Sequence, residues 1–165
     1  MSEQAPQPQE APAPAQAGEA PSGLTPEAIA LARTFFTAAR TGSVPSLQPA
    51  LEAGLPANMT NENGDTLLML AAYHGHAEVV RLLLKHGADP NRLNDRLQSP
   101  LAGALFKDET AVVEALLEGG ANPDVGQPTA WQAARMFGKL ERWEGEMGRV
   151  RERLSKEGGQ DVAEQ

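Results

Sequence analysis

The chain contains no cysteine, and aromatic side chains make up only 4% of its 165 residues. Without cysteine it has no disulfide framework, no thiol nucleophile and no thiolate ligand for a metal. No apolar run approaches the ~20 residues that a membrane-spanning helix requires. We therefore expect one modest folded domain with tails, and no membrane partner.

Positive charge is also scarce, because 14 Lys and Arg face 22 Asp and Glu, for a formal net charge of -8. Binding to phosphate backbones requires a clustered excess of positive charge, so we expect no nucleic-acid partner. The first 22 residues have neither the basic start nor the apolar segment of a secretory signal. We expect a cytoplasmic protein, with a nuclear location as the alternative if the source is eukaryotic.

Residues 1–23 consist mainly of alanine, proline, glutamine and glutamate, with prolines at positions 6, 8, 12, 14 and 21. Because they contain no branched or aromatic side chains, they cannot offset the entropy lost on ordering. We predict a disordered, solubilising tail here and a second disordered tail over residues 157–165. The alternative for the first tail is that its Pro-x-Pro pieces are ligands for proline-reading domains.

Residues 64–91 hold the most informative pattern, because the pattern recurs every 33 residues. Shifting by 33 pairs Thr66 with Ser99, Leu68 with Leu101, Ala71 with Ala104, Val79 and Val80 with Val112 and Val113, Leu83 and Leu84 with Leu116 and Leu117, and Gly87 and Ala88 with Gly120 and Ala121. A weaker earlier copy includes Gly42 and Gly54, and a fourth copy begins at Thr129 after 30 residues. A repeat of this length indicates a solenoid of stacked units.

The repeated unit resembles the ankyrin repeat. The family positions are occupied by Thr66, Leu68, Ala71, Ala72, Gly75, His76, Val79, Val80, Leu82, Leu83, Leu84, Gly87, Ala88, Asp89 and Asn91. The resemblance implies an all-α solenoid of ankyrin repeats, with helix-turn-helix units, β-hairpin fingers and capping helices at both ends. We assign the array to residues 24–156, with units at about 24–63, 64–96, 97–126 and 127–156.

Several positions depart from the family pattern. Leu67 stands where proline is usual, and Met69 and Ala102 stand where the family has a histidine that links successive units. We expect stability there to depend more on apolar packing. In the third unit Asp108 and Glu109 replace the Gly-His pair, so we expect a slightly altered turn.

The two ends of the array have their own signals. The second helix contains Pro49, which removes a backbone hydrogen bond, so we expect it to be the weakest helix. An apolar stripe of period 3.6 predicts a final helix over about residues 139–155, through Leu140, Trp143, Met147, Val150 and Leu154. The stripe is expected to cap the array; the alternative is that Val150 and Leu154 dock a partner or a second copy.

The sequence offers few groups for catalysis or metal binding. Of the three histidines, His74 and His76 lie two residues apart, but no spaced cysteine or carboxylate completes a ligand set. The resemblance gives His76 a structural role. There is no glycine-rich phosphate loop and no nucleophile motif. We therefore expect no catalytic residues, no cofactor and no metal.

The resemblance also implies where a partner binds, because in ankyrin arrays the fingers and the residue pair before the turn glycine line the concave face. The candidate protein-binding residues are Arg40, Glu62, Asn63, Asp65, Tyr73, His74, Asp95, Arg96, Gln98, Phe106, Lys107, Met136 and Phe137. An apolar row with a charged rim is the composition of a protein interface. Alternatively, the rings of Tyr73 and Phe106 lie flat on their own helices or are covered by the tails.

These observations predict a monomeric protein-protein interaction module that binds and regulates or scaffolds a partner through its concave face. The competing prediction is a small-ligand or metal-binding protein or an enzyme, with its site near His74 and the acidic fingers.

Overall fold

The computed structural model of the chain describes residues 24–160, and within this range eight helices follow one another with no strand. Their bounds are α1 Pro26–Thr41, α2 Val44–Glu52, α3 Leu67–Tyr73, α4 Ala77–Lys85, α5 Pro100–Lys107, α6 Thr110–Glu118, α7 Ala130–Met136 and α8 Leu140–Gln160. None of these helices is long and apolar enough to cross a bilayer. The predicted tail over residues 1–23 lies outside the described residues.

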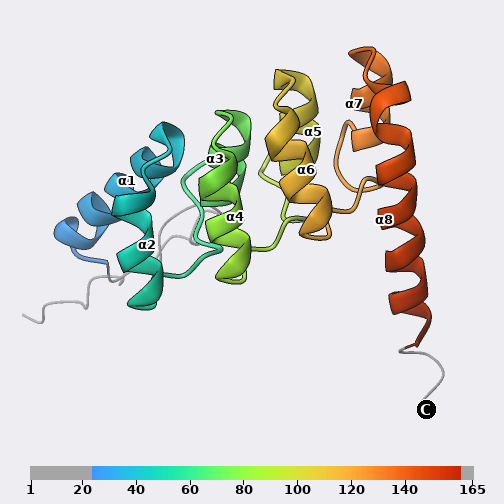
Figure 1. Cartoon of the computed structure of the whole chain (residues 1–165). Helices are drawn as coiled ribbons and strands as arrows, with labels where there is room; N and C mark the ends of the chain where they lie inside the picture. The colour runs from blue at the N-terminus through green and yellow to red at the C-terminus, as the bar shows by residue number, and fades with distance from the viewer. Residues whose placement is uncertain (1–23, 161–165) are drawn as a thin grey trace, which may run out of the picture.

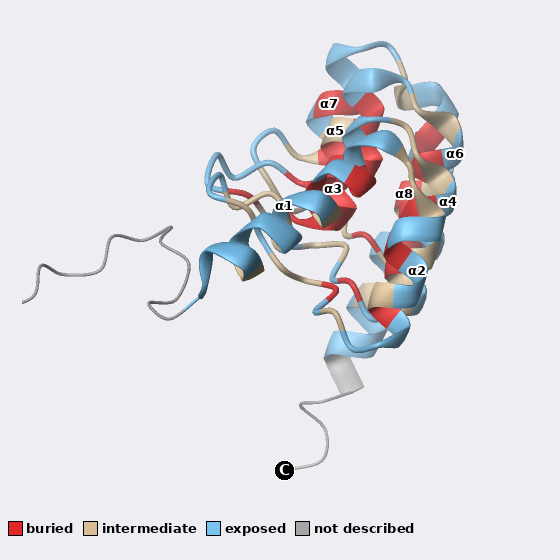
Figure 2. Ribbon diagram, turned by 90° about the vertical axis from the view of Figure 1, so that its left-hand side faces the viewer, coloured by how far each residue is buried: buried red, intermediate tan, exposed pale blue. Residues whose placement is uncertain are grey.

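The eight helices form four antiparallel pairs that stand side by side in a row (Figure 1). Successive pairs contact each other through two layers, since α1, α3, α5 and α7 form one layer and α2, α4, α6 and α8 the other. The residues coloured as buried lie mainly on the parts of the helices where the two layers face each other (Figure 2). The predicted all-α repeat solenoid is therefore confirmed.

Four helices of the first layer begin at the hydroxyl residues that the sequence indicates. The side chains of Thr25, Thr66, Ser99 and Thr129 each accept a hydrogen bond from the backbone N–H three residues later. Such a bond satisfies one of the donors that a helix start leaves without a partner. The repeated Thr or Ser thus sets the register of the helices that line the concave face.

The turn within each helix pair requires a left-handed residue. Gly42, Gly75 and Gly138 provide it with φ angles of 77°, 81° and 68°. The expected alteration of the third turn is small: Asp108 takes the left-handed conformation, with φ 59° and ψ 36°, and α5 ends one repeat position later than α3. Aspartate tolerates this region better than most side chains. The Asp108 carboxylate also pairs with Lys139 Nζ at 2.7 Å, across to the next turn.

Alanine substitutions in the first and the last of these turns test how much the packing between repeats contributes to stability. A Cβ on Gly42 would lie 2.4 Å from His76 Nδ1, whereas a Cβ on Gly138 would meet no atom within 4 Å. Gly138→Ala should destabilise the fold by about 1–2 kcal/mol through backbone strain alone. Gly42→Ala should cost about 1 kcal/mol more, because it also displaces the His76 ring from its hydrogen bond. Equal losses in urea unfolding would contradict this account.

The finger loops are not the β-hairpins that we expected. One isolated bridge, between Thr60 and Thr66, is the single β pairing in the described range 24–160. Instead the Asn61 side chain accepts hydrogen bonds from the Asn63 and Asp65 N–H groups, each at 3.0 Å. Asn94 repeats this closure in the next finger. A five-residue loop closed by asparagine leaves too little extended chain for a ladder.

The helix α2 forms despite Pro49, which lies in its interior. Proline there removes one backbone hydrogen bond, and α2 contacts a second-layer neighbour, α4, on one side alone. We expect the α2 amides around Leu51 to exchange with solvent faster than those of Val79 to Leu84 in α4, because unit stabilities in solenoids are partly local. Hydrogen exchange measures this directly, and the opposite order would contradict it.

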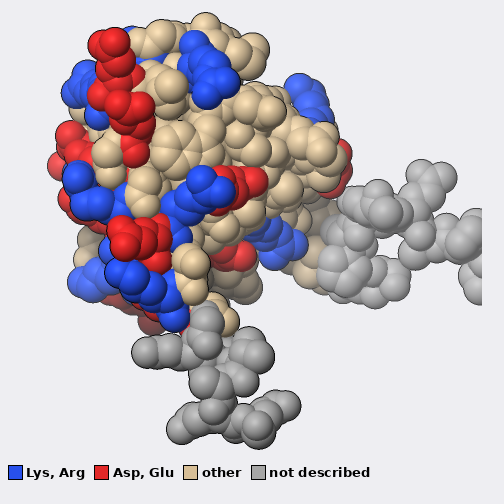
Figure 3. Space-filling view, turned by 90° about the vertical axis from the view of Figure 1, so that its right-hand side faces the viewer, with Lys and Arg blue, Asp and Glu red and all other residues tan. Residues whose placement is uncertain are grey.

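The last helix closes the stack and runs further than its apolar stripe predicts, to Gln160 rather than Ser155, so residues 157–160 are helical. Val150 is 6% exposed and Leu154 packs against the core, so neither presents a free docking surface. Its outer surface carries interspersed positive and negative side chains (Figure 3). These features fit a solvent-facing cap.

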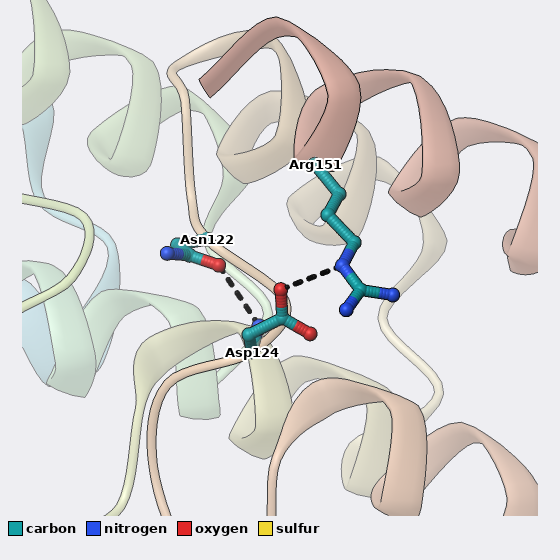
Figure 4. A network of polar contacts seen from close by, with 3 residues as sticks. All are labelled: Asn122, Asp124 and Arg151. Carbon is teal, nitrogen blue, oxygen red and sulfur yellow. Dashed lines mark hydrogen bonds and ion pairs between the residues drawn. The ribbon is translucent and has the colours of Figure 1, made fainter. Parts of the chain in front are cut away.

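A set of polar contacts links α8 to the loop between α6 and α7 (Figure 4). Asn122 accepts from the Asp124 N–H at 2.9 Å, and the Asp124 carboxylate pairs with Arg151 Nε at 3.0 Å. Asn91 in turn accepts from the Asn122 N–H at 2.6 Å. These bonds hold the third and fourth units in register.

Candidate functional site

The first-layer helices and the finger loops enclose a groove of about 590 Å³. Most of the predicted binding residues line it: Arg40, Asn63, Asp65, Tyr73, His74, Arg96, Gln98, Phe106, Met136 and Phe137. Glu62, Asp95 and Lys107 are exposed but do not line it. The groove therefore brings together side chains from all four units.

The floor of the groove contains residues that the sequence did not single out as binding residues. Met69, Leu70, Pro100, Ala102 and Gly103 contribute to it, together with Asn94, Ser99, Pro128 and Ala133. Most are buried, and the repeat pattern assigns such positions to the core. They share no side-chain type, but two of them, Ala102 and Gly103 on α5, are small.

Three aromatic rings form a continuous row along the groove. The Tyr73 and Phe106 rings stack with centroids 6.5 Å apart at 14°, and Phe106 meets Phe137 edge to face at 5.1 Å. The exposed fractions are 39% for Tyr73, 53% for Phe106, 37% for Phe137 and 68% for the neighbouring Met136. The rings thus pack on one another while each keeps part of its surface in solvent. We call Tyr73, Phe106 and Phe137 the aromatic row.

The finger side of the groove is held by a polar network. The buried Asn94 side chain donates to the Asp65 carboxylate at 2.9 Å and to Gln98 Oε1 at 3.0 Å. The Asp95 N–H donates to the Asn63 carbonyl at 3.1 Å, from one finger to the next. A network whose buried amide is fully engaged is rigid, so the fingers provide a fixed wall.

The opposite edge, at the helix ends, carries basic groups. Arg40 lies in the last turn of α1, His74 follows the end of α3, and Lys107 is the last residue of α5. The Lys107 Nζ lies 5.0 Å from the centre of the Tyr73 ring. Burial lowers the pKa of His74 below 6.5, and the nearby His76, Arg40 and Lys107 lower it further. We call Arg40, His74 and Lys107 the basic edge.

The lowered pKa of His74 can be tested by substitution. Because positive charge on Lys107 disfavours the imidazolium, Lys107→Met should raise the His74 pKa measured by NMR titration. The lowered pKa also makes the free energy of unfolding depend on pH. The contribution of His74 to that free energy is complete above pH 6.5, and it declines as the pH falls through the lowered pKa of the folded state. A His74 pKa that stays unchanged or falls in the variant would contradict this arrangement.

His76 has a structural role. Its Nε2–H donates to the Arg40 carbonyl at 2.7 Å, which ties the second unit to the first. This bond supplies an inter-unit link although Met69 occupies the family's linking-histidine position. Residues 24–160 contain no group of three or more His, Asp or Glu side chains arranged to hold a metal. No observation in this part of the chain favours the ligand-binding or enzyme alternative.

Comparison with known proteins agrees with the fold. The family model for ankyrin repeats matches three copies over residues 35–127. An ankyrin repeat protein of Pseudomonas aeruginosa is 54% identical over 48 residues, which cover 29% of this chain and 28% of that protein. Ankyrin repeat domain-containing protein 29 of human and of zebrafish (Danio rerio) is 43% identical over 60 residues, which cover 36% of this chain and 20% of each relative.

The matches cover the repeats rather than whole proteins, since the chain spans less than a third of the length of these curated relatives. The fourth helix pair, α7 and α8, lies beyond the matched residues but packs on the third as the others pack on their neighbours. Ankyrin repeats are generally protein-interaction modules. The recurring sequence unit, the stacked helix pairs and the family match together show that this chain belongs to the ankyrin repeat family.

Proposed function

We propose that the array is a protein-protein interaction module that grips a partner protein in its concave groove and thereby regulates or scaffolds it. The observation that carries this proposal is the aromatic row, whose rings keep a third or more of their surface exposed inside a groove. Contiguous exposed apolar surface within a polar rim is characteristic of binding sites. A rigid finger wall lowers the entropy lost on binding.

The groove suits an extended or helical protein segment better than a compact ligand. Inner helices packed ~10 Å apart give a length of about 30 Å across four units. One side of this length is polar, at Asp65 and Arg96, and the other is basic, at Arg40 and Lys107. We propose a monomeric cytoplasmic protein with a folded array between two tails, which engages a protein rather than nucleic acid or membrane.

A substitution at the groove floor tests the proposal. Gly103 lies on α5, and a Cβ there would make only an ordinary contact with Tyr73 Cδ2 at 3.7 Å. Gly103→Ala should therefore keep the groove open, whereas Gly103→Arg should fill it without entering the core. The parent protein and the Gly103→Ala variant should capture the same partner from a lysate of the source organism. The Gly103→Arg variant should no longer capture it.

Circular dichroism and thermal melting would verify that all three proteins are folded. If the folded Gly103→Arg variant captures the same protein with the same affinity, the groove is not the binding site.

A further inference from the structure

The groove is polarised across its width. Its helix-end side carries the basic edge, with Lys107 at the rim, whereas its finger side combines one carboxylate, Asp65, with one cation, Arg96. The Asp65 carboxylate already accepts from Asn94, so the finger side is rigid and carries no excess of positive charge. His74 lies between Arg40 and Lys107, because α3 packs between α1 and α5. A segment with carboxylates and no cations would place those carboxylates along the basic edge.

The aromatic row adds a second requirement. Partly exposed tyrosine and phenylalanine rings in a groove are the surfaces on which proline-rich segments pack, because an extended polyproline helix offers its rings at little entropic cost. Tyr73 and Phe106 stack nearly parallel, at 14°, and so offer such a surface across two units. The groove thus fits an extended segment that is rich in proline, acidic and free of lysine and arginine.

Residues 1–23 of this chain have that composition. They contain five prolines, the glutamates Glu3, Glu10 and Glu19, and no lysine or arginine. We propose that this segment docks in the groove, with its prolines on Tyr73 and Phe106 and its glutamates along the basic edge, and competes with the partner. The regulatory part of this proposal rests on the proposed function, whereas the docking itself does not.

The geometry permits this intramolecular contact. In an extended polyproline conformation 23 residues reach about 70 Å. The path along the 16-residue α1 and then along the four units is about 55 Å. Figure 2 shows that the start of α1 and the finger loops lie on the same side of the molecule. Tethering gives an effective concentration on the order of 1 mM, so even docking with a Kd of ~1 mM would fill the groove about half of the time.

A spin label on the full chain tests the docking. Because the chain has no cysteine, Ala11→Cys provides a single attachment site for a nitroxide. The label should remove most of the amide NMR signal at Gly103 and Phe106 and leave Arg81 on α4 unaffected. In the Glu3→Lys, Glu10→Lys, Glu19→Lys background these signals should recover, as they should with Tyr73→Ala and Phe106→Ala.

The docking would be overturned by no signal loss in the groove, by a uniform loss over both layers, or by a loss that the charge reversals leave unchanged. Signal loss that appears only between labelled and unlabelled copies would also overturn it, since the segment would then bind a second copy. If the segment docks, the variant with all three glutamates changed to lysine should bind the captured partner about two- to tenfold more tightly than the parent protein does. Equal partner affinity of the two proteins would refute the competition and leave the proposed function intact. Partner capture that Gly103→Arg does not reduce would refute the proposed function alone.

Discussion

Replacing Leu83 with alanine is expected to lower the free energy of unfolding by about 2–5 kcal/mol. Leu83 is fully buried on α4, which packs between α2 and α6. Removing three carbons of its side chain leaves a cavity in the core beside a helix that is packed on both sides. Because a solenoid is held together by nearest-neighbour interfaces, the loss should reach the whole array.

Urea unfolding followed by circular dichroism would measure this loss. Arg81→Ala is the matched control, because Arg81 lies on the exposed side of the same helix and should change stability by less than about 0.5 kcal/mol. A Leu83→Ala loss as small as that of the control would show that the α4 interface is not part of the stabilising core.

The second large effect is expected in binding rather than folding. The double substitution Tyr73→Ala and Phe106→Ala removes the centre of the aromatic row and should weaken partner binding by ~2 kcal/mol or more, roughly thirtyfold. The rings stack on each other and Lys107 lies over Tyr73. Because of these contacts the double variant should also lose about 1 kcal/mol of folding stability, but it should stay folded.

Isothermal titration with the captured partner would measure the affinity. Leu31→Ala is the control, because Leu31 is an apolar side chain, 56% exposed, that does not line the groove. If the double variant is folded and binds like Leu31→Ala, the partner contacts a different surface of the array.

Several features of the fold follow from short stretches of sequence. The 33-residue period, the Thr or Ser at four helix starts and the buried Val79, Val80 and Leu83 all depend on local spacing. Helix capping and one-sided burial are properties of a few neighbouring residues. The pattern therefore predicted the repeat units, their order and most of the side chains that line the concave face.

Other features depend on contacts between units, and only the tertiary structure decided them. The pairing of Asp108 with Lys139 and the bond from His76 to the Arg40 carbonyl could not be inferred from spacing. The same holds for the floor at Ala102 and Gly103 and for the stacking of Tyr73 on Phe106. These features arise because residues about 33 apart meet across a helix-helix interface, where packing distance and ring orientation are set by both partners at once.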